Sequence, residues 1–168
     1  MIIISDANVI VYFWRAELLN RLHTSINVQI TEKIYLEITK HHRLLTSYPD
    51  LALHIQEHRH NSQIANPITV VQVEAQYRDE TDIEMHYHLN DESGLDDGEI
   101  EGILLSVISG KEFVTSELKA VEYFNDILDH NSEGKARDFE SFLGQLFDGG
   151  VINQAEKKRL IEIKMSKD

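Results

Sequence analysis

Short apolar runs alternate along this chain with longer segments of helical periodicity, and this alternation limits the fold more than any other feature. The runs lie at residues 2–4, 27–30, 68–73 and 113–114. The first is wholly apolar, as in strands buried on both faces of a parallel sheet, and the third is rich in β-branched residues. The alternation predicts a three-layer α/β/α fold with a central parallel sheet of four to five strands.

The helical segments are expected between these runs and after them. They cover residues 9–22, 31–45, about 51–64, 80–89 and 100–108, and the chain from Lys119 to the end with a break at Gly149-Gly150. Thr31 is expected to cap a helix with Ile34, Ile38 and Leu45 on its apolar face. We expect a single domain over 1–168, with a motif-bearing α/β core over 1–125 and C-terminal helices over 126–168.

Composition narrows the class of protein. The absence of cysteine excludes disulfides and thiolate zinc sites. No apolar run approaches the roughly 20 residues that span a bilayer, so we expect a cytoplasmic protein that does not enter a membrane. The net charge of -13 excludes a surface that is basic everywhere but leaves room for a local basic rim. Candidates for that rim, or simply scattered surface charges, are Arg15, Arg43, Arg59, Lys111 and Lys119.

Acidic residues fall at or near the ends of the predicted strands and helices. Asp6 follows the first strand, and Glu37 flanks the apolar face of the second helix. Asp96 and Glu99 open the helix in GLDDGEIEGILLS, and Glu117 follows the fourth strand in EFVTSELKAV. Ligands of open α/β sheets bind outside the carboxyl ends of the strands, so these acids are expected to converge there.

Converging carboxylates repel one another, and a cation removes that cost. Hard oxygen ligands without cysteine point to Mg²⁺ or Mn²⁺. Such a site can hold two ions about 4 Å apart and activate water for in-line attack on a phosphodiester. The pattern therefore predicts a metal site of Asp6, Glu37, Glu99 and Glu117.

Each acid also has a structural interpretation. Asp6 and Asn8 can mark a strand-to-helix cap, a role we assign to Asn8. Asp96 and Glu99 have the spacing of a capping box, which needs no metal. Glu37 alone would be a solvated helix residue and Glu117 alone a turn residue, so the prediction depends on all four occurring in this order.

The ordered motifs at Asp6, at Glu37, at LDDGEIEGI (95–103) and at VTSE (114–117) resemble those of the PIN-domain nucleases. The similarity is to the branch with an LDxGExEAI helix start, close to the VapC-type toxins, and covers residues 1–125, with a helical tail also typical of that branch. It implies a Mg²⁺- or Mn²⁺-dependent endoribonuclease with catalytic Asp6, Glu37, Glu99 and Glu117, and Asp96 as a further metal ligand or Glu101 nearby. It also implies an RNA substrate and an antitoxin protein partner, and leaves a homodimer open.

Two positions depart from that family pattern, and other functions stay open. Glu117 stands where the family usually has Asp, and Gly102 stands where Ala is usual. The main alternative is a PIN-like module that has lost catalysis and binds a protein or an RNA. A nuclease directed at DNA is a third possibility.

The nine histidines raise the question of zinc. His54 and His58 lie four residues apart with His60 close by, and His86 and His88 flank Tyr87. An i, i+4 pair can bind zinc, but no HExxH motif is present and the surrounding residues are polar. We therefore predict that His54 and His58 lie on a solvated helix face.

Overall fold

One sheet of five parallel strands organises the fold, which the computed structural model describes for residues 1–128 and 135–166. In chain order the elements are β1 (Ile2–Ile4), α1 (Ala7–Arg15), α2 (Leu19–Ser25), β2 (Val28–Thr31), α3 (Glu32–Thr39), α4 (His42–Ser47), α5 (Pro49–His60), β3 (Thr69–Val71), the 3₁₀ turn η1 (Val73–Gln76), α6 (Glu80–Glu92), α7 (Asp97–Ser109), β4 (Glu112–Thr115), α8 (Leu118–Tyr123), the π-helical turn η2 (Phe124–Leu128), β5 (Lys135–Asp138), α9 (Phe139–Asp148) and α10 (Gln154–Met165). The strand order is β3-β2-β1-β4-β5, and all neighbours are parallel. The predicted α/β class and strand number are confirmed.

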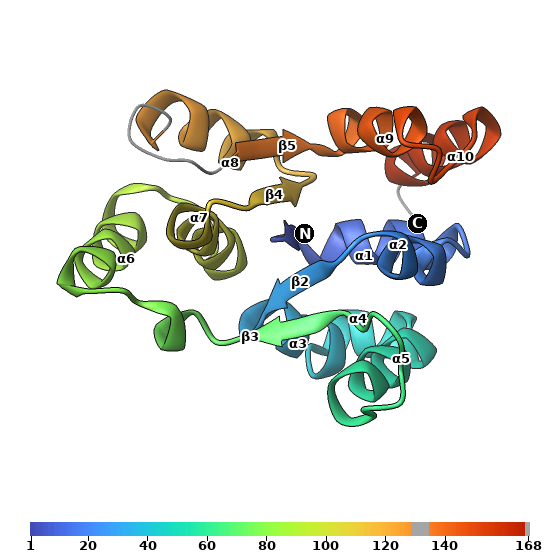
Figure 1. The fold of residues 1–168 in the computed structure, drawn as a ribbon, viewed down its shortest axis with the longest axis horizontal. Coiled ribbons are helices and arrows are strands. Elements are labelled where there is room, and N and C mark those ends of the chain that lie inside the picture. Colours follow the sequence, from blue (N-terminus) through green and yellow to red (C-terminus); the bar gives the residue numbers. More distant parts are fainter. Residues whose placement is uncertain (129–134, 167–168) are drawn as a thin grey trace.

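Helices cover both faces of the sheet, because the central strand is apolar on both sides. Ile2 and Ile4 of β1 belong to one hydrophobic cluster, and Ile3 belongs to the other. The first cluster packs α1, α2, α3, α5, α9 and α10 against the sheet, whereas the second holds α7 with parts of α6 and η2. Figure 1 shows α6 and α7 on one side of the strands and α1, α9 and α10 on the other.

The prediction of helices throughout residues 126–168 is wrong at β5. The four residues of this strand, KARD, contain no apolar run, so their own sequence does not indicate a strand. Pairing with β4 supplies the reason, since Glu112 aligns with Lys135 along the parallel ladder. Arg137 strengthens it through an ion pair with Glu112 at 2.8 Å. Residues 129–134 of the predicted helix lie outside the described residues.

Several predicted helices are divided by local backbone geometry. The segment 9–22 forms α1 and α2, which separate at Glu17, where φ is 60°. The segment 31–45 forms α3 and α4, and Leu45 is 40% exposed instead of lying on an apolar face. Thr31 occupies the N-cap position of α3, yet its side chain makes no capping hydrogen bond. The predicted break at Gly149-Gly150 is confirmed.

Gly102 allows α7 to approach β1 very closely. A Cβ atom at this position would lie 2.2 Å from Cβ of Ser5, which is far inside van der Waals contact. The neighbouring Gly98 is similar, since its Cβ would lie 2.7 Å from Cδ1 of Ile34. These glycines bring the first turns of α7 against the carboxyl ends of the strands, where the predicted acids lie.

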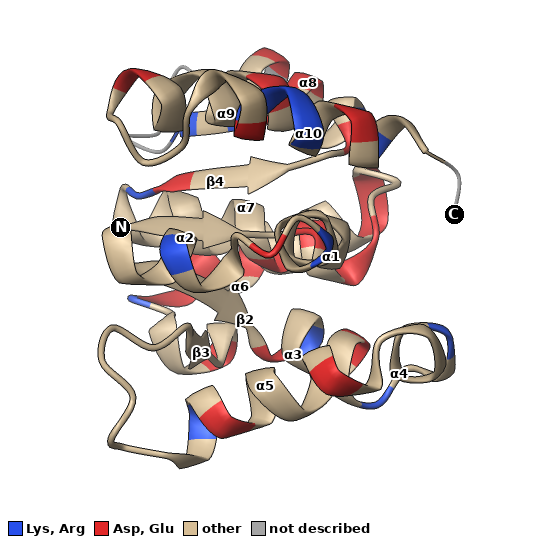
Figure 2. Ribbon diagram, turned by 90° about the vertical axis from the view of Figure 1, so that its right-hand side faces the viewer, with Lys and Arg blue, Asp and Glu red and all other residues tan. Residues whose placement is uncertain are grey.

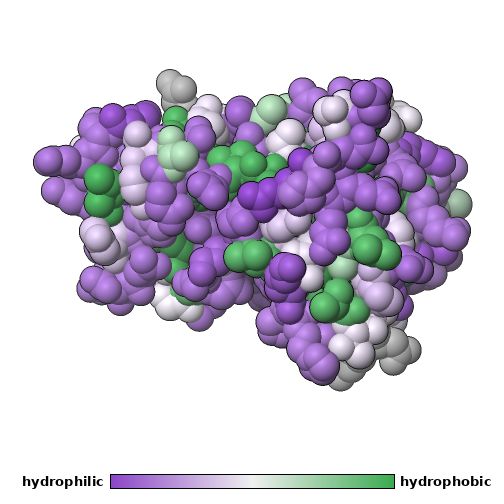
Figure 3. All heavy atoms as spheres, turned by 90° about the horizontal axis from the view of Figure 1, so that it is seen from below, coloured by the Kyte–Doolittle hydropathy of each residue, from purple (hydrophilic) through white to green (hydrophobic). Residues whose placement is uncertain are grey.

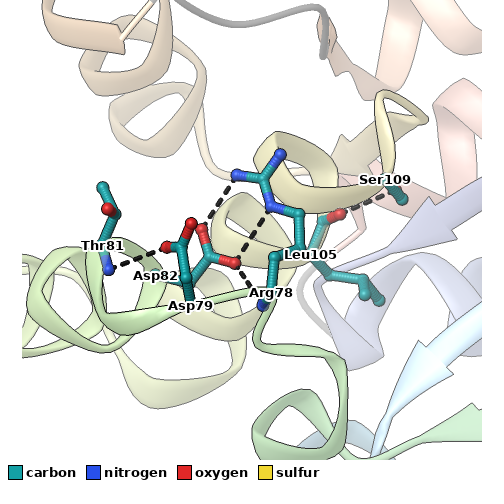
Figure 4. A network of polar contacts seen from close by, with 6 residues as sticks. All are labelled: Arg78, Asp79, Thr81, Asp82, Leu105 and Ser109. Carbon is teal, nitrogen blue, oxygen red and sulfur yellow. Dashed lines mark hydrogen bonds and ion pairs between the residues drawn. The ribbon is translucent and has the colours of Figure 1, made fainter.

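An ion pair between the exposed Arg78 and the buried Asp82 fixes the start of α6 (Figure 4). Asp82 is only 1% exposed and accepts hydrogen bonds from the backbone amide, Nε and Nη2 of Arg78 at 2.7, 3.0 and 2.9 Å. The guanidinium of Arg78 holds the pKa of Asp82 below its ordinary value. Asp79 caps the same helix by accepting from the amide of Thr81 at 2.9 Å. The hydrogen bonds from Arg78 thus offset the cost of burying the charge of Asp82.

The surface carries apolar residues mainly as separate patches. Figure 3 shows one face of the molecule, which is largely hydrophilic with small hydrophobic areas between the polar ones. Within residues 1–128 and 135–166, none of the helices combines the length and apolar character needed to cross a bilayer.

Candidate functional site

Asp6 joins the carboxyl ends of β1 and β4, which are neighbours in the sheet. Its Oδ1 accepts from the amide of Asn8 at 2.9 Å, and its Oδ2 accepts from the amide of Ser116 at 3.0 Å and from the hydroxyl of Ser116. Asp6 is therefore the N-cap residue of α1, and the assignment of that cap to Asn8 is wrong. The residue is 9% exposed, and its carboxylate is held by two separate segments.

Glu99 enters the same region from the first turn of α7. It is 5% exposed, and the amide of Glu99 donates to Oδ1 of Asp96 at 2.9 Å. Burial, followed by the negative charges of Asp96, Glu117 and Asp6, raises the pKa of Glu99 to about 7. Asp96 does act as the helix cap, while the side chain of Glu99 lies among other acids.

Glu37 approaches from α3 and is half-buried. Burial raises the pKa of Glu37, and the charges of Asp6 and Asp96 raise it further, while His41 and Arg43 act in the opposite direction. Glu37 is therefore not the fully solvated helix residue of the structural interpretation. Asp6, Glu37, Asp96, Glu99 and Glu117 are called the acid group below.

The acid group lies at the carboxyl edge of the sheet, as the pattern predicts. In Figure 2, β4 points toward the side of the molecule where acidic segments lie around α1, and α4, which contains one basic residue, Arg43, lies on that side too. Glu117 and Asp96 are exposed at this edge, and Glu99 is buried beneath them. Four separate elements of the chain thus bring carboxylates within electrostatic range of one another.

The donor set fits a hard divalent cation. Oxygen ligands from carboxylates suit Mg²⁺ and Mn²⁺, and the raised pKa values of Glu37 and Glu99 report negative charge that no adjacent cationic side chain neutralises fully. The acids do not form a closed cage of ligands. When one ligand atom is taken from each acid, no three of these atoms lie within 4.8 Å of one another. Such spacing suits Mg²⁺, which retains several waters and takes few carboxylates directly.

Sequence reasoning missed Ser116 and Tyr12 at this site. Ser116 carries no motif signal, yet it donates twice to Asp6. Tyr12 lies beside the acid group and forms a hydrogen bond with Ser116. Burial and the charge of Asp6 raise the pKa of Tyr12, and this hydrogen bond lowers it. Tyr12 is one turn after Asn8 on α1, and this helical spacing was the available signal.

Glu101, the expected neighbour of the acids, belongs elsewhere. It is 5% exposed, and burial with the charge of Glu74 raises its pKa to about 7, while the charge of Lys33 acts in the opposite direction. It lines a separate pocket of about 240 Å³ with Lys33 and Glu74.

Four of the five candidate rim cations lie in different parts of the molecule. The charge of Arg43 lowers the pKa of Glu37, and the charge of Arg15 lowers the pKa of Tyr12. Arg59 pairs with Glu32 at 2.8 Å. Lys111 lies just before β4, at the amino end of the strands, so of the two readings it fits a scattered surface charge.

The prediction that His54 and His58 lie on a solvated helix face is wrong. His58 is 6% exposed, and with His23 and His54 it forms the one set of three metal-ligating side chains, among the described residues, with ligand atoms within 4.8 Å of one another. The spacing of Leu51, Ile55 and His58 on α5 was the signal that could have placed His58 on the buried face.

The hydrogen bonds of this histidine cluster do not fit a three-histidine metal site. The amide of Ile68 donates to Nδ1 of His58 at 2.8 Å, so the proton of the neutral ring is on Nε2. That nitrogen lies 3.1 Å from Nε2 of His54 and donates to it. His58 therefore has no free lone pair for a metal, and burial with the charges of His23 and His54 lowers its pKa to about 4.

Comparison of the chain with protein-family models, with curated proteins and with solved structures finds no match in any of the three.

Proposed function

We propose that this chain is a metal-dependent endoribonuclease of PIN type, with Asp6, Glu37, Glu99 and Glu117 as its Mg²⁺ or Mn²⁺ ligands and Asp96 beside them. The observation that carries the proposal is the electrostatic convergence of these acids from β1, α3, α7 and β4. The ordered motifs and the parallel sheet support the PIN assignment. Function is argued from the site because a fold alone supports many activities.

The acid group has distinct parts in this proposal. Hydrogen bonds from Asn8 and Ser116 fix the orientation of Asp6, so its carboxylate enters the site preorganised. Burial of Glu99 keeps water from screening its charge, which makes its attraction to a cation larger. When bound, the divalent ion supplies Lewis-acid stabilisation and activates water for attack on the phosphodiester.

A cleavage assay with Asp6→Asn tests the assignment. Asn caps helices about as well as Asp, so the variant should fold while losing RNA cleavage in Mn²⁺. Asp79→Asn is the matched control, since Asp79 caps α6 away from the acid group and its substitution should leave cleavage intact. Persistent cleavage by highly purified Asp6→Asn protein would refute the assignment.

The alternative function is a PIN-like module that binds protein or RNA without catalysis. Two observations favour it: Glu117 is exposed in place of the family's Asp, and the net charge is -13. Mn²⁺-dependent stabilisation of a protein that cleaves no RNA or DNA would support this function over the nuclease.

We also propose a toxin role, in which an antitoxin covers the acid group with a basic segment. Arginine would pair well with such carboxylates. Purification of the chain from its native host should recover a small basic partner. Its repeated absence would contradict the toxin role and leave nuclease chemistry untouched.

A further inference from the structure

A small polar pocket of about 240 Å³ lies between α3, the turn η1, α6 and α7, and it is called the Glu101 pocket below. The side chains that line it are Lys33, Glu74, His86, Asn90, Asp97 and Glu101. A cavity of about 150 Å³ admits benzene, so this pocket has room for a polar group on a short chain of carbon atoms.

Glu101 forms the buried end of this pocket. The residue is 5% exposed, whereas the other residues of the lining are exposed or half-buried. Within residues 1–128 and 135–166, Oε2 of Glu101 is among the few buried side-chain oxygens that have no hydrogen-bond partner. A buried carboxylate oxygen without a donor is costly, so the site favours a ligand that brings N–H donors and positive charge.

Lys33, the lysine of the pocket, does not supply that donor. Its Nζ lies 3.9 Å from Oδ2 of Asp97, and both of these side chains are more than half exposed. None of the ion pairs in the described part of the chain joins Lys33 to Glu101. Burial and the charge of Glu74 raise the pKa of Glu101 to about 7, although the charge of Lys33 acts in the opposite direction. The lysine therefore leaves the buried carboxyl group incompletely compensated.

The side of the pocket formed by η1 and α6 also experiences the negative charge. Burial raises the pKa of Tyr77, and the charges of Glu74, Tyr87 and Glu101 raise it further. The hydroxyl of Tyr77 shares a hydrogen bond with Nδ1 of His86, which fixes the imidazole ring at the pocket wall. Glu74 and Glu101 therefore act together on this region, although they come from different elements.

The balance of charge suits a singly charged ligand. The charges that act most strongly on Glu101, those of Glu74 and Lys33, have opposite signs, whereas three acids act most strongly on Glu99. A divalent ion is attracted more strongly to a group of acids and is repelled more strongly by a nearby lysine. The Glu101 pocket thus differs from the acid group in the cation that it favours.

We infer that the Glu101 pocket binds a primary ammonium group on a short alkyl chain, carried by a small free amine or by a lysine side chain of a protein partner. An ammonium has three N–H donors, and one of them satisfies Oε2 of Glu101 at the buried end of the pocket. Its single charge is balanced by the carboxylate. The inference does not depend on the nuclease proposal, because it uses none of the residues of the acid group.

Titration of the full chain with n-butylammonium, followed by amide chemical shifts in NMR, tests the pocket without RNA or metal. The buffer contains EDTA at constant ionic strength and pH 8, where alkylammonium groups are protonated. The amides of the residues that line the pocket should shift and saturate. Butyltrimethylammonium has the same charge and chain but no N–H donor, so it should bind about tenfold more weakly or less tightly still.

Three variants separate this site from general charge and from folding. Glu101→Gln keeps the size of the side chain and should weaken butylammonium binding about tenfold or more, because the charge-assisted hydrogen bond is lost. Lys33→Gln removes the competing cation and should strengthen binding. Glu84→Gln removes an exposed acid from α6, two residues from His86 and therefore on another side of the helix, and should leave binding unchanged. A melting temperature at or above that of wild type confirms that Glu101→Gln is folded.

A second probe identifies the source of the ammonium group. Nα-acetyl-lysine N-methylamide carries the same group on a peptide backbone. If it binds more tightly than butylammonium, the ligand is a lysine side chain of a partner, and if it binds more weakly, the ligand is a free amine. Both results support the pocket.

Four results would overturn the inference. They are the absence of saturable shifts with butylammonium, equal affinity for butyltrimethylammonium, unchanged binding in Glu101→Gln, and displacement of butylammonium by equimolar Mg²⁺ in buffer without EDTA. Asp6→Asn should bind butylammonium as wild type does, so failure of the nuclease proposal and failure of this inference are distinguishable.

Discussion

Replacement of Glu99 by Gln tests the acid group through stability alone. Because its pKa is raised from 4.5 to about 7, folded Glu99 holds its proton more tightly than in the unfolded chain. The stability that this proton gives is present below pH 4.5 and is lost as the pH rises through 7. A difference of one in pKa between the folded and unfolded states corresponds to roughly 1.4 kcal/mol, so ionised Glu99 destabilises the metal-free protein by up to about 3 kcal/mol at pH 8. The residue is 5% exposed, so solvent screening does not reduce this figure greatly.

Glu99→Gln removes that charge while keeping the size and helical position of the side chain. The metal-free variant should therefore melt roughly 6–12 °C above wild type at pH 8 and close to wild type at pH 4.5. Thermal unfolding followed by circular dichroism in EDTA, at half-unit steps of pH, measures the difference. Addition of Mn²⁺ at a hundred times its dissociation constant should stabilise wild type by about 2.7 kcal/mol, and most of that gain should disappear in the variant.

Glu101→Gln is the matched control for this experiment. Glu101 lies on the same helix with the same exposure and a pKa also raised to about 7, but it faces Lys33 and Glu74. Its substitution should raise metal-free stability at pH 8 and leave the Mn²⁺ response intact. Equal Mn²⁺ responses in wild type and Glu99→Gln, with no metal-free gain, would show that Glu99 only helps to start α7.

Three further predictions follow from individual residues. Glu117→Gln should slow Mn²⁺-dependent cleavage while Glu117→Asp preserves much of it; a wild-type rate in the Gln variant would remove Glu117 from the site. The pKa of His58 is lowered from 6.5 to about 4, so its contribution to stability is present above pH 6.5 and lost toward pH 4, and His58→Gln should lose less stability over that range in an acid titration. Gly102→Ala should cost about 1–3 kcal/mol in urea unfolding because its methyl would meet Ser5, whereas Gly144→Ala, with nothing within 4 Å, should be neutral or stabilising; equal effects would contradict the close approach of α7.

The strands differ in how well the sequence predicts them, for a physical reason. β1 is buried on both faces, so Ile2–Ile4 must be apolar and the strand is visible in the sequence. β5 lies at the sheet edge and is only partly buried, so its residues are free to be polar. Its conformation comes from the ladder with β4 and the pair of Arg137 with Glu112, which are contacts between distant segments.

The same distinction applies to the candidate site. Asp6 and Glu117 follow strands, and parallel strands end at one edge, so their proximity is predictable from the order of elements. The burial of Glu99 depends on how closely α7 approaches β1. That approach depends on the packing of Gly102 against Ser5, a contact between distant segments that the sequence does not reveal. The hydrogen bonds from Ser116 to Asp6 are similarly invisible, because a serine in a loop carries no pattern.

Comparison of two buried acids supports the proposal that the acid group binds a cation. Asp82 is 1% exposed, and three hydrogen bonds from Arg78 compensate its charge and lower its pKa. Glu99 is nearly as buried, yet the charges that act on it most strongly, those of Asp96, Glu117 and Asp6, are acidic, and its pKa rises to about 7. A chain that neutralises one buried acid with arginine leaves the other among like charges, at a cost in stability. That cost is offset once a divalent ion joins the acids, so the arrangement suits ion binding better than it suits the stability of the free protein.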